Sequence, residues 1–144
     1  MDDIMIKKLE DYFSREKNEL FIGQPVENKA IESAEKQLNV KFDNDYKEFI
    51  TRFGGSYIGL PIYAFNNCKM LSDKTVIDLT LDFRNTYLVD NRFPLIHKSY
   101  VISMSGNGDP VIISPHGKVE MYYHDNNKKE VLSNSFQELL QMHL

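Results

Sequence analysis

The stretch IESAEKQLNVKFDNDYKEFITRFGG, residues 31–55, contains two helical patterns in succession and decides the fold. The first helix is expected to begin after an N-cap at Asn28 and to end near Leu38. The second helix follows an N-cap at Asp43, and the closing glycine pair ends it, because glycine adopts the left-handed C-terminal conformation without strain. Both helices carry apolar side chains at intervals of three and four residues. Each is therefore predicted to pack one face against a core.

One carboxylate, Glu35, interrupts the apolar face of the first helix. Glu35 is either an acid or base in an apolar setting, or an acceptor for backbone amides of a neighbouring loop. No second catalytic group accompanies it in the sequence, so we predict the structural role. The second helix has an aromatic face that includes Tyr46 and Phe49. These two residues are predicted to lie in the core, and Gly55 is predicted to shape the helix end.

The segments on either side of this stretch extend the pattern. Residues 3–19 predict a helix and residues 56–65 a strand, which Pro61 restricts to a sheet edge or a bulge. Residues 75–87 fit both an alternating strand and a helical stripe preceded by an N-cap at Ser72 or Asp73. Periodicity does not separate these alternatives, so both remain open at this point.

The C-terminal half predicts a strand meander and a closing helix. The expected strands are residues 100–104, 111–114 and 119–123, and Ser135 begins a helix with the spacing of a capping box. Helices followed by a meander and a last helix form an α+β layout. With 144 residues the chain has the length of one domain, and we predict a mixed or antiparallel sheet flanked by helices.

The glycine-containing stretch SGNGDPVIISPHGKVEMYYHDN, residues 105–126, raises the question of a phosphate or metal site. Gly106 and Gly108 precede an aspartate and a strand instead of a helix N-terminus, and no P-loop lysine follows. We therefore predict that both glycines are hairpin turn residues. The scattered histidines lack the spacing of zinc ligands, and DNNKKE, residues 125–130, lacks the alternating ligands and central glycine of a calcium loop. No metal or other cofactor is therefore expected.

Composition narrows the class of function. A net charge of −4 argues against a nucleic-acid binder. A single cysteine, the lack of a signal peptide and the lack of a long apolar run indicate a cytoplasmic protein without a membrane partner. No pattern gathers a nucleophile, a base and oxyanion donors, so we do not expect an enzyme. A small hydrolase remains a further alternative.

Four blocks of the sequence together resemble the SUKH superfamily. Residues 31–55 resemble its first block, with Glu35, Tyr46, Phe49 and the glycine pair in matching positions. The later blocks are FPLIHKSYVISMSGNGDPVIIS (residues 93–114), GKVEMYYHDNN (residues 117–127) and SNSFQELLQ (residues 133–141). The resemblance covers about residues 27–142, preceded by an N-terminal helix, and it implies that residues 75–87 are helical.

The resemblance also implies a function. It suggests a bacterial immunity protein that binds and neutralises the toxin domain of a polymorphic secreted toxin, often a nuclease. The wider family includes a fungal cell-wall regulator, so a regulatory or scaffolding module is the alternative. The oligomeric state stays undetermined.

An acidic protein is able to mimic nucleic-acid phosphates in the basic groove of a nuclease. On this hypothesis carboxylates supply the partner-binding charge and tyrosines supply anchors. The acidic candidates are Asp78, Asp82, Asp90, Asp109, Glu120 and Asp125. The aromatic candidates are Tyr57, Tyr63, Tyr122 and Tyr123.

Overall fold

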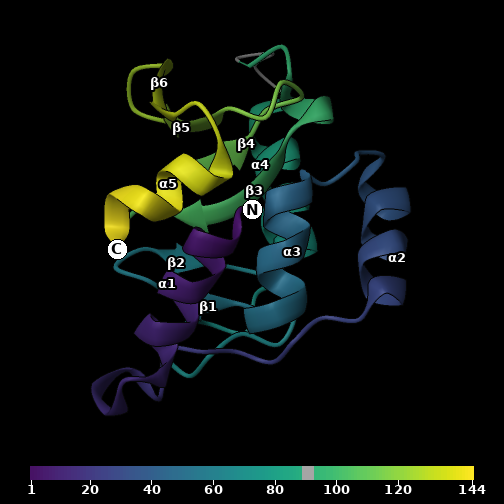
Figure 1. The fold of residues 1–144 in the computed structure, drawn as a ribbon. Coiled ribbons are helices and arrows are strands. Elements are labelled where there is room, and N and C mark those ends of the chain that lie inside the picture. The colour runs from purple at the N-terminus through teal and green to yellow at the C-terminus, as the bar shows by residue number, and fades with distance from the viewer. Residues whose placement is uncertain (89–92) are drawn as a thin grey trace.

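A four-stranded antiparallel sheet in the order β3-β4-β5-β6 organises the fold (Figure 1). Its strands are β3 (Tyr100–Met104), β4 (Pro110–Ile113), β5 (Val119–Tyr123) and β6 (Lys128–Ser133). In the computed structural model, which describes residues 1–88 and 93–144, a two-stranded hairpin lies next to β3. Its strands are β1 (Ser56–Tyr57) and β2 (Pro61–Ile62). The predicted α+β class is confirmed.

Strands β3 and β4 are buried on both faces of the sheet, and all four residues of the inner strand β4 are buried. Helices α1 (Asp3–Ser14), α3 (Asn44–Phe53) and α5 (Phe136–His143) form one core with one face. Helix α2 (Asn28–Leu38) joins that core and also contacts α4. Helix α4 (Val76–Leu88) covers the opposite face and forms a second core (Figure 1).

The aromatic face of α3 lies at the centre of the larger core. Tyr46 and Phe49 are fully buried, and each ring packs edge-on against Phe136 of α5 with centroids 5.6 Å apart. The Tyr46 hydroxyl donates to the carbonyl of Tyr63 at 2.6 Å. Burial raises the pKa of Tyr46 well above its usual value. The side chain therefore stays neutral and ties α3 to the chain that follows β2.

The loop between α2 and α3 is fixed at both of its ends. Glu35 Oε2 accepts the backbone N–H of Phe42 at 2.8 Å, which is the type of contact predicted for it. The Glu35 side chain is 19% exposed and lies 4.0 Å from Lys47 Nζ, so it is less buried than its place on an apolar face suggests. Asp43 caps α3 as predicted, and its own N–H donates to the Tyr100 hydroxyl at 2.7 Å.

Several boundaries differ from the sequence-based expectation. The first helix ends at Ser14, a short 3₁₀ helix follows, and Glu27 instead of Asn28 is the N-cap of α2. Residues 56–65 form two short strands because the chain reverses between them. Strand β6 was not expected. Its sequence KKEVLS lacks apolar alternation, because four of its six residues are exposed at the sheet edge.

Segment 75–87 is helical, as the family resemblance implies, and α4 runs from Val76 to Leu88. The expected caps Ser72 and Asp73 are wrong. Thr75 Oγ1 accepts the N–H of Asp78 at 3.1 Å, and Asp78 Oδ2 accepts the N–H of Thr75 at 2.9 Å. This reciprocal pair is a capping box, and it fixes the start of α4.

Arg84 of α4 links the helix to two other parts of the chain. Its guanidinium donates to the carbonyl of Leu38 at 2.7 Å, at the end of α2. It also donates to three carbonyls in the segment that directly precedes β3, at 3.1–3.2 Å. They are those of Ile96, His97 and Ser99. Burial lowers the pKa of Arg84. One side chain thus satisfies four carbonyls that end a helix or precede a strand.

Replacing Arg84 by alanine should lower the free energy of unfolding by about 2–3 kcal/mol, because carbonyls that accept from a charged donor lose their partner. Arg84→Lys should lose part of that stability, since a single ammonium does not reproduce the planar set of donors. Urea unfolding followed by circular dichroism measures both. The control is Arg52→Ala, which removes an exposed ion pair with Glu48 and should change stability by less than about 0.5 kcal/mol. Equal effects of Arg84→Ala and Arg52→Ala would contradict this role.

The turn between β3 and β4 uses its two glycines differently. Gly108 has φ +83° and donates to the Ser105 carbonyl at 3.0 Å. Gly106 is exposed, does not have a positive φ, and has open space around the position of a Cβ. Of these two positions, only position 108 therefore requires glycine for its backbone conformation. Gly55 is restricted for another reason, because a Cβ there would lie 1.9 Å from Asn67 Oδ1.

We expect Gly108→Val to lower the free energy of unfolding by more than about 1 kcal/mol, because valine is strained at positive φ. Gly106→Val, two residues away, should cost less than about 0.5 kcal/mol. Thermal unfolding of the two variants gives the comparison. Similar losses at both positions would refute this assignment, and tight nucleotide binding abolished by either change would refute the turn interpretation.

Candidate functional site

The outer surface of α4 carries two of the predicted acidic residues. Asp78, Leu81, Asp82 and Asn85 are exposed and follow helical spacing, so they form one strip, which we call the α4 face. Leu81 is 42% exposed although its neighbours on the strip are polar. The α4 face therefore presents an apolar side chain between two carboxylates.

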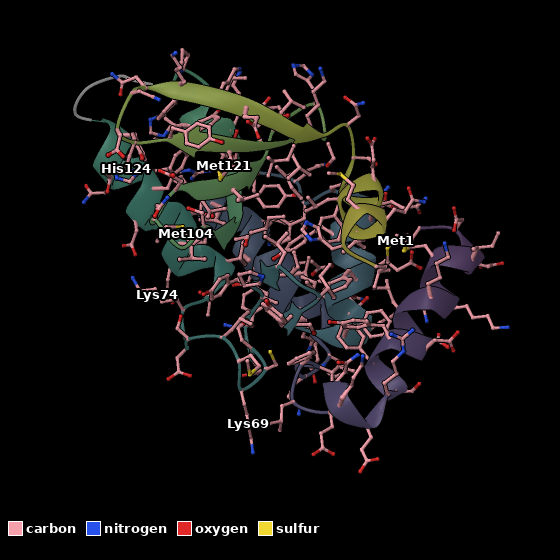
Figure 2. The ribbon with its side chains drawn as sticks, turned by 90° about the vertical axis from the view of Figure 1, so that its left-hand side faces the viewer. Met1, Lys69, Lys74, Met104, Met121 and His124 are labelled. Atoms are coloured by element: carbon pink, nitrogen blue, oxygen red, sulfur yellow. The ribbon has the colours of Figure 1, made fainter. Side chains whose placement is uncertain are left out.

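A hollow of about 490 Å³ lies beside this strip, between α4 and the β3–β4 hairpin, and we call it the α4 groove. Figure 2 labels three of its residues, Lys74, Met104 and His124, along one side of the molecule. Its floor is apolar and comprises Leu79, Phe83, Tyr87, Met104 and Pro110. Its rim is polar and comprises Lys74, Asp82, Thr86, Asn107 and His124. An apolar floor with a polar rim is typical of a recognition site.

Packing holds α4 rigidly under this surface. Buried Thr80 accepts the N–H of Val101 in β3 at 2.9 Å, a contact that fixes helix and strand to each other. Phe83 packs on the ring of Tyr122 in β5, with centroids 5.6 Å apart. Together with the Arg84 contacts, these interactions make the α4 face a preformed surface.

Charged pairs line the rim of the α4 groove. Lys74 Nζ lies 3.0 Å from Asp82 Oδ2, and the hydrogen bond to Asp82 raises the pKa of Lys74. On the opposite wall, the His124 ring contacts Asp109 through Nδ1 and Asp125 through Nε2, the latter at 3.0 Å. One wall therefore carries an ion pair, and the other carries a histidine between two carboxylates.

Three of the predicted partner-binding residues are buried instead of exposed. Asp109 and Glu120 are each only 6% exposed, and Tyr122 stacks on Phe93 with centroids 4.0 Å apart. Desolvation, followed by the nearby Glu120 carboxylate, raises the pKa of Tyr122 to about 12. Asp109 lies in the β3–β4 turn, and its side chain accepts the backbone N–H of His124 just after β5. These residues serve the fold, because the sheet is covered on both faces.

The remaining candidates are dispersed. Asp125 is exposed in the β5–β6 turn next to His124. Tyr57 packs on Phe21, with ring centroids 5.2 Å apart, on the β1–β2 hairpin. Tyr63 and Tyr123 are half-buried. Asp90 lies outside the described residues. Of the predicted acidic residues, Asp78 and Asp82 share one surface, and Asp125 lies near the wall of the α4 groove.

Sequence reasoning missed Leu81 and the α4 groove. Leu81 becomes recognisable once residues 75–87 are assigned to a helix, since it is then the apolar residue on a polar face. The α4 groove had no local signal, because its walls come from separate segments of the chain, residues 74–87, 104–110 and 124.

Asp109 and Asp125 should respond differently to substitution. Asp109→Ala removes a buried carboxylate that accepts the backbone N–H of His124 and should lower the free energy of unfolding by about 1–3 kcal/mol. Asp125→Ala should change it by less than about 0.5 kcal/mol, because that side chain is exposed in a turn. Denaturant titration of the two variants tests the difference. Equal stability of both variants would contradict a stabilising role of the Asp109 side chain.

Other types of site find no support in the described parts of the chain. Within residues 1–88 and 93–144, no group of three or more histidine, cysteine or acidic residues is arranged to hold a metal ion. None of the helices in these ranges is long and apolar enough to cross a membrane.

Comparison with known families identifies one match. The model of the SUKH_5 family, described as SMI1-KNR4 cell-wall, matches residues 2–144, which is nearly the whole chain. A comparison with curated proteins finds no match.

Proposed function

Since this chain belongs to the SUKH superfamily, we propose that it is an immunity protein that binds a cognate toxin domain stoichiometrically and neutralises it. The observation that carries this proposal is the α4 face, where Leu81 is exposed between Asp78 and Asp82. The α4 groove lies directly beside it. A preformed surface with an apolar anchor and flanking charge is suited to protein recognition.

The physical role of each group follows from its exposure. Leu81 supplies apolar area that leaves water on binding. Asp78 and Asp82 favour a basic partner, and the net charge of −4 adds a weak long-range attraction. Because α4 is fixed through Thr80 and Arg84, little conformational entropy is lost when the partner docks.

In this proposal, fewer of the predicted carboxylates are able to mimic nucleic-acid phosphates. Asp109 and Glu120 are buried, so they do not present charge to a nuclease groove. Among the predicted acidic residues that the structure describes, the accessible ones are Asp78 and Asp82 of the α4 face and Asp125 nearby. We propose that the protein acts by covering the toxin and without turning over a substrate.

The α4 groove also supports the alternative function, a scaffolding module for a peptide-like partner. Its apolar floor, with Phe83 and Met104, suits one side chain of an extended segment. The two functions differ in which surface is essential. An immunity protein of the proposed type depends on Leu81, whereas a peptide-binding module depends on the groove floor and Asn107.

Coexpression with the toxin domain encoded by the neighbouring gene should restore growth, and the purified pair should form a stable complex. Leu81→Asp should weaken that complex at least about tenfold, because it removes an apolar anchor. Asp78→Lys combined with Asp82→Lys should slow association and reduce its salt dependence. Surface plasmon resonance at low and high salt measures both effects. Met142→Asp, at an exposed apolar position on α5, is the matched control.

Two outcomes would count against the proposal. A folded protein that neither binds nor protects against the neighbouring toxin would overturn the immunity function. A complex that tolerates Leu81→Asp but is lost when Asn107 is changed to Lys would move the contact into the α4 groove and favour the scaffolding alternative.

A further inference from the structure

The charged groups that the structure describes around the α4 groove are mainly acidic. On the α4 side, Lys74 Nζ lies 3.0 Å from Asp82 Oδ2, and the Asp78 carboxylate also acts on the Lys74 charge. On the opposite wall, two carboxylates flank the His124 ring, and the side chain of one of them, Asp125, is 86% exposed. Among the described residues, one lysine and one histidine therefore accompany four carboxylates, and these groups favour a cation in the groove.

Below this acidic rim the groove is apolar. Phe83 and Met104 belong to its floor, and Met104 lies between Lys74 and His124 along the side of the molecule that Figure 2 shows. The volume of about 490 Å³ falls within the range of ligand pockets, about 300–1,000 Å³. Space is open beside Gly108, which also lines the groove. The groove therefore suits a group with an apolar stem and a positively charged head.

An arginine side chain has both of these properties. Its methylene stem is apolar and suits the floor, while the guanidinium stays at the level of the carboxylates. Lysine has a similar form, but its ammonium is strongly hydrated, whereas the guanidinium is weakly hydrated and its planar donors match a carboxylate in a bidentate way. An acidic side chain would be repelled by the rim, and a purely apolar one would gain nothing from its charges.

Two carboxylates at the groove are accessible to a guanidinium. Lys74 contacts Oδ2 of Asp82, and Nε2 of His124 contacts Oδ1 of Asp125. The side chains of Asp82 and Asp125 are 63% and 86% exposed. Because an ionised carboxylate accepts hydrogen bonds at both of its oxygens, each keeps a second oxygen for an incoming donor. A guanidinium is therefore able to bind either carboxylate without breaking the existing pair.

We propose that the α4 groove binds an arginine side chain of the partner protein, with its stem on the apolar floor and its guanidinium on the rim carboxylates. The inference rests on the proposed function for the identity of the partner, and it adds a specific polar contact beside the Leu81 anchor. Arginine is enriched at protein interfaces, where one such side chain in a pocket contributes strongly to binding.

A short peptide tests the groove without the toxin. The probe is acetyl-Gly-Arg-Gly-amide, and the matched control carries citrulline, which has the shape of arginine without its charge. With isotope-labelled methionine methyl groups, NMR follows Met104 in the groove, and Met121, which packs against the larger core, is the internal control (Figure 2). The arginine peptide should shift the Met104 signal with a dissociation constant of about 1–10 mM. The citrulline peptide should bind at least about fivefold more weakly.

Substitutions at Asn107 reverse the charge at one position of the rim. Asn107 is exposed in the β3–β4 turn, so its replacement should leave the fold unchanged. Asn107→Asp should tighten binding of the arginine peptide about threefold, and Asn107→Lys should weaken it about threefold, because the added charge lies beside the guanidinium. The same two changes at Asn66, an exposed position in the loop after β2 and outside the groove, should leave the dissociation constant unchanged.

Several outcomes would overturn the arginine assignment. They are equal affinities of the arginine and citrulline peptides, tighter binding of a lysine or leucine peptide, and effects of the same sign for Asn107→Asp and Asn107→Lys. A Met104 signal that stays unchanged at about 50 mM arginine peptide would overturn it as well. A protein that binds the arginine peptide but no toxin would contradict the proposed function alone. A stable toxin complex without any arginine preference would contradict this inference alone.

Discussion

Strands β3 and β4 of the central sheet are buried on both faces, and this constraint governs the rest of the structure. Strand β4 is buried at every position, so each face must be covered. Helices α1, α3 and α5 cover one face with a large aromatic core, and α4 covers the other with Leu79, Phe83 and Tyr87. A sheet covered on one side alone would expose Val101, Ile112 and Tyr122 to water. The identity of segment 76–88 as a helix follows from this requirement.

Fixing α4 on the sheet has a consequence for recognition. Thr80 and Arg84 use side chains to satisfy the backbone of β3 and its approach, so the helix is held by polar contacts as well as by packing. In the α4 face, Asp78 caps the helix and Asp82 forms an ion pair with Lys74. The exposed Leu81 is presented on a surface that does not need to reorganise. This is the arrangement in which a small apolar contact contributes most to binding.

The same sheet leaves one edge exposed. The β3 edge is occupied by Thr80, Arg84 and the backbone of Tyr63, whereas β6 has only β5 beside it. Two separate elements, α4 and β6, therefore have exposed surfaces, and their chemistry differs. The α4 face combines an apolar anchor with carboxylates, and β6 combines an open strand edge with exposed lysine and glutamate side chains.

The sequence by itself determined the elements whose signals are local. The spacing of Tyr46 and Phe49, the caps Asp43 and Ser135, and the turn at Gly108 reflect interactions within a few residues. Tertiary structure decided what depends on distant segments. Asp109 and Glu120 have the sequence appearance of surface carboxylates, but neighbouring strands and helices bury them. Arg84 looks like an ordinary helix-surface cation, yet it donates to the carbonyl of Leu38, 46 residues away in α2. Strand β6 lacks an apolar period because four consecutive residues at this sheet edge are exposed, and the α4 groove exists only where α4 meets the β3–β4 hairpin. Burial and pairing are properties of the assembled chain, so no local pattern encodes them.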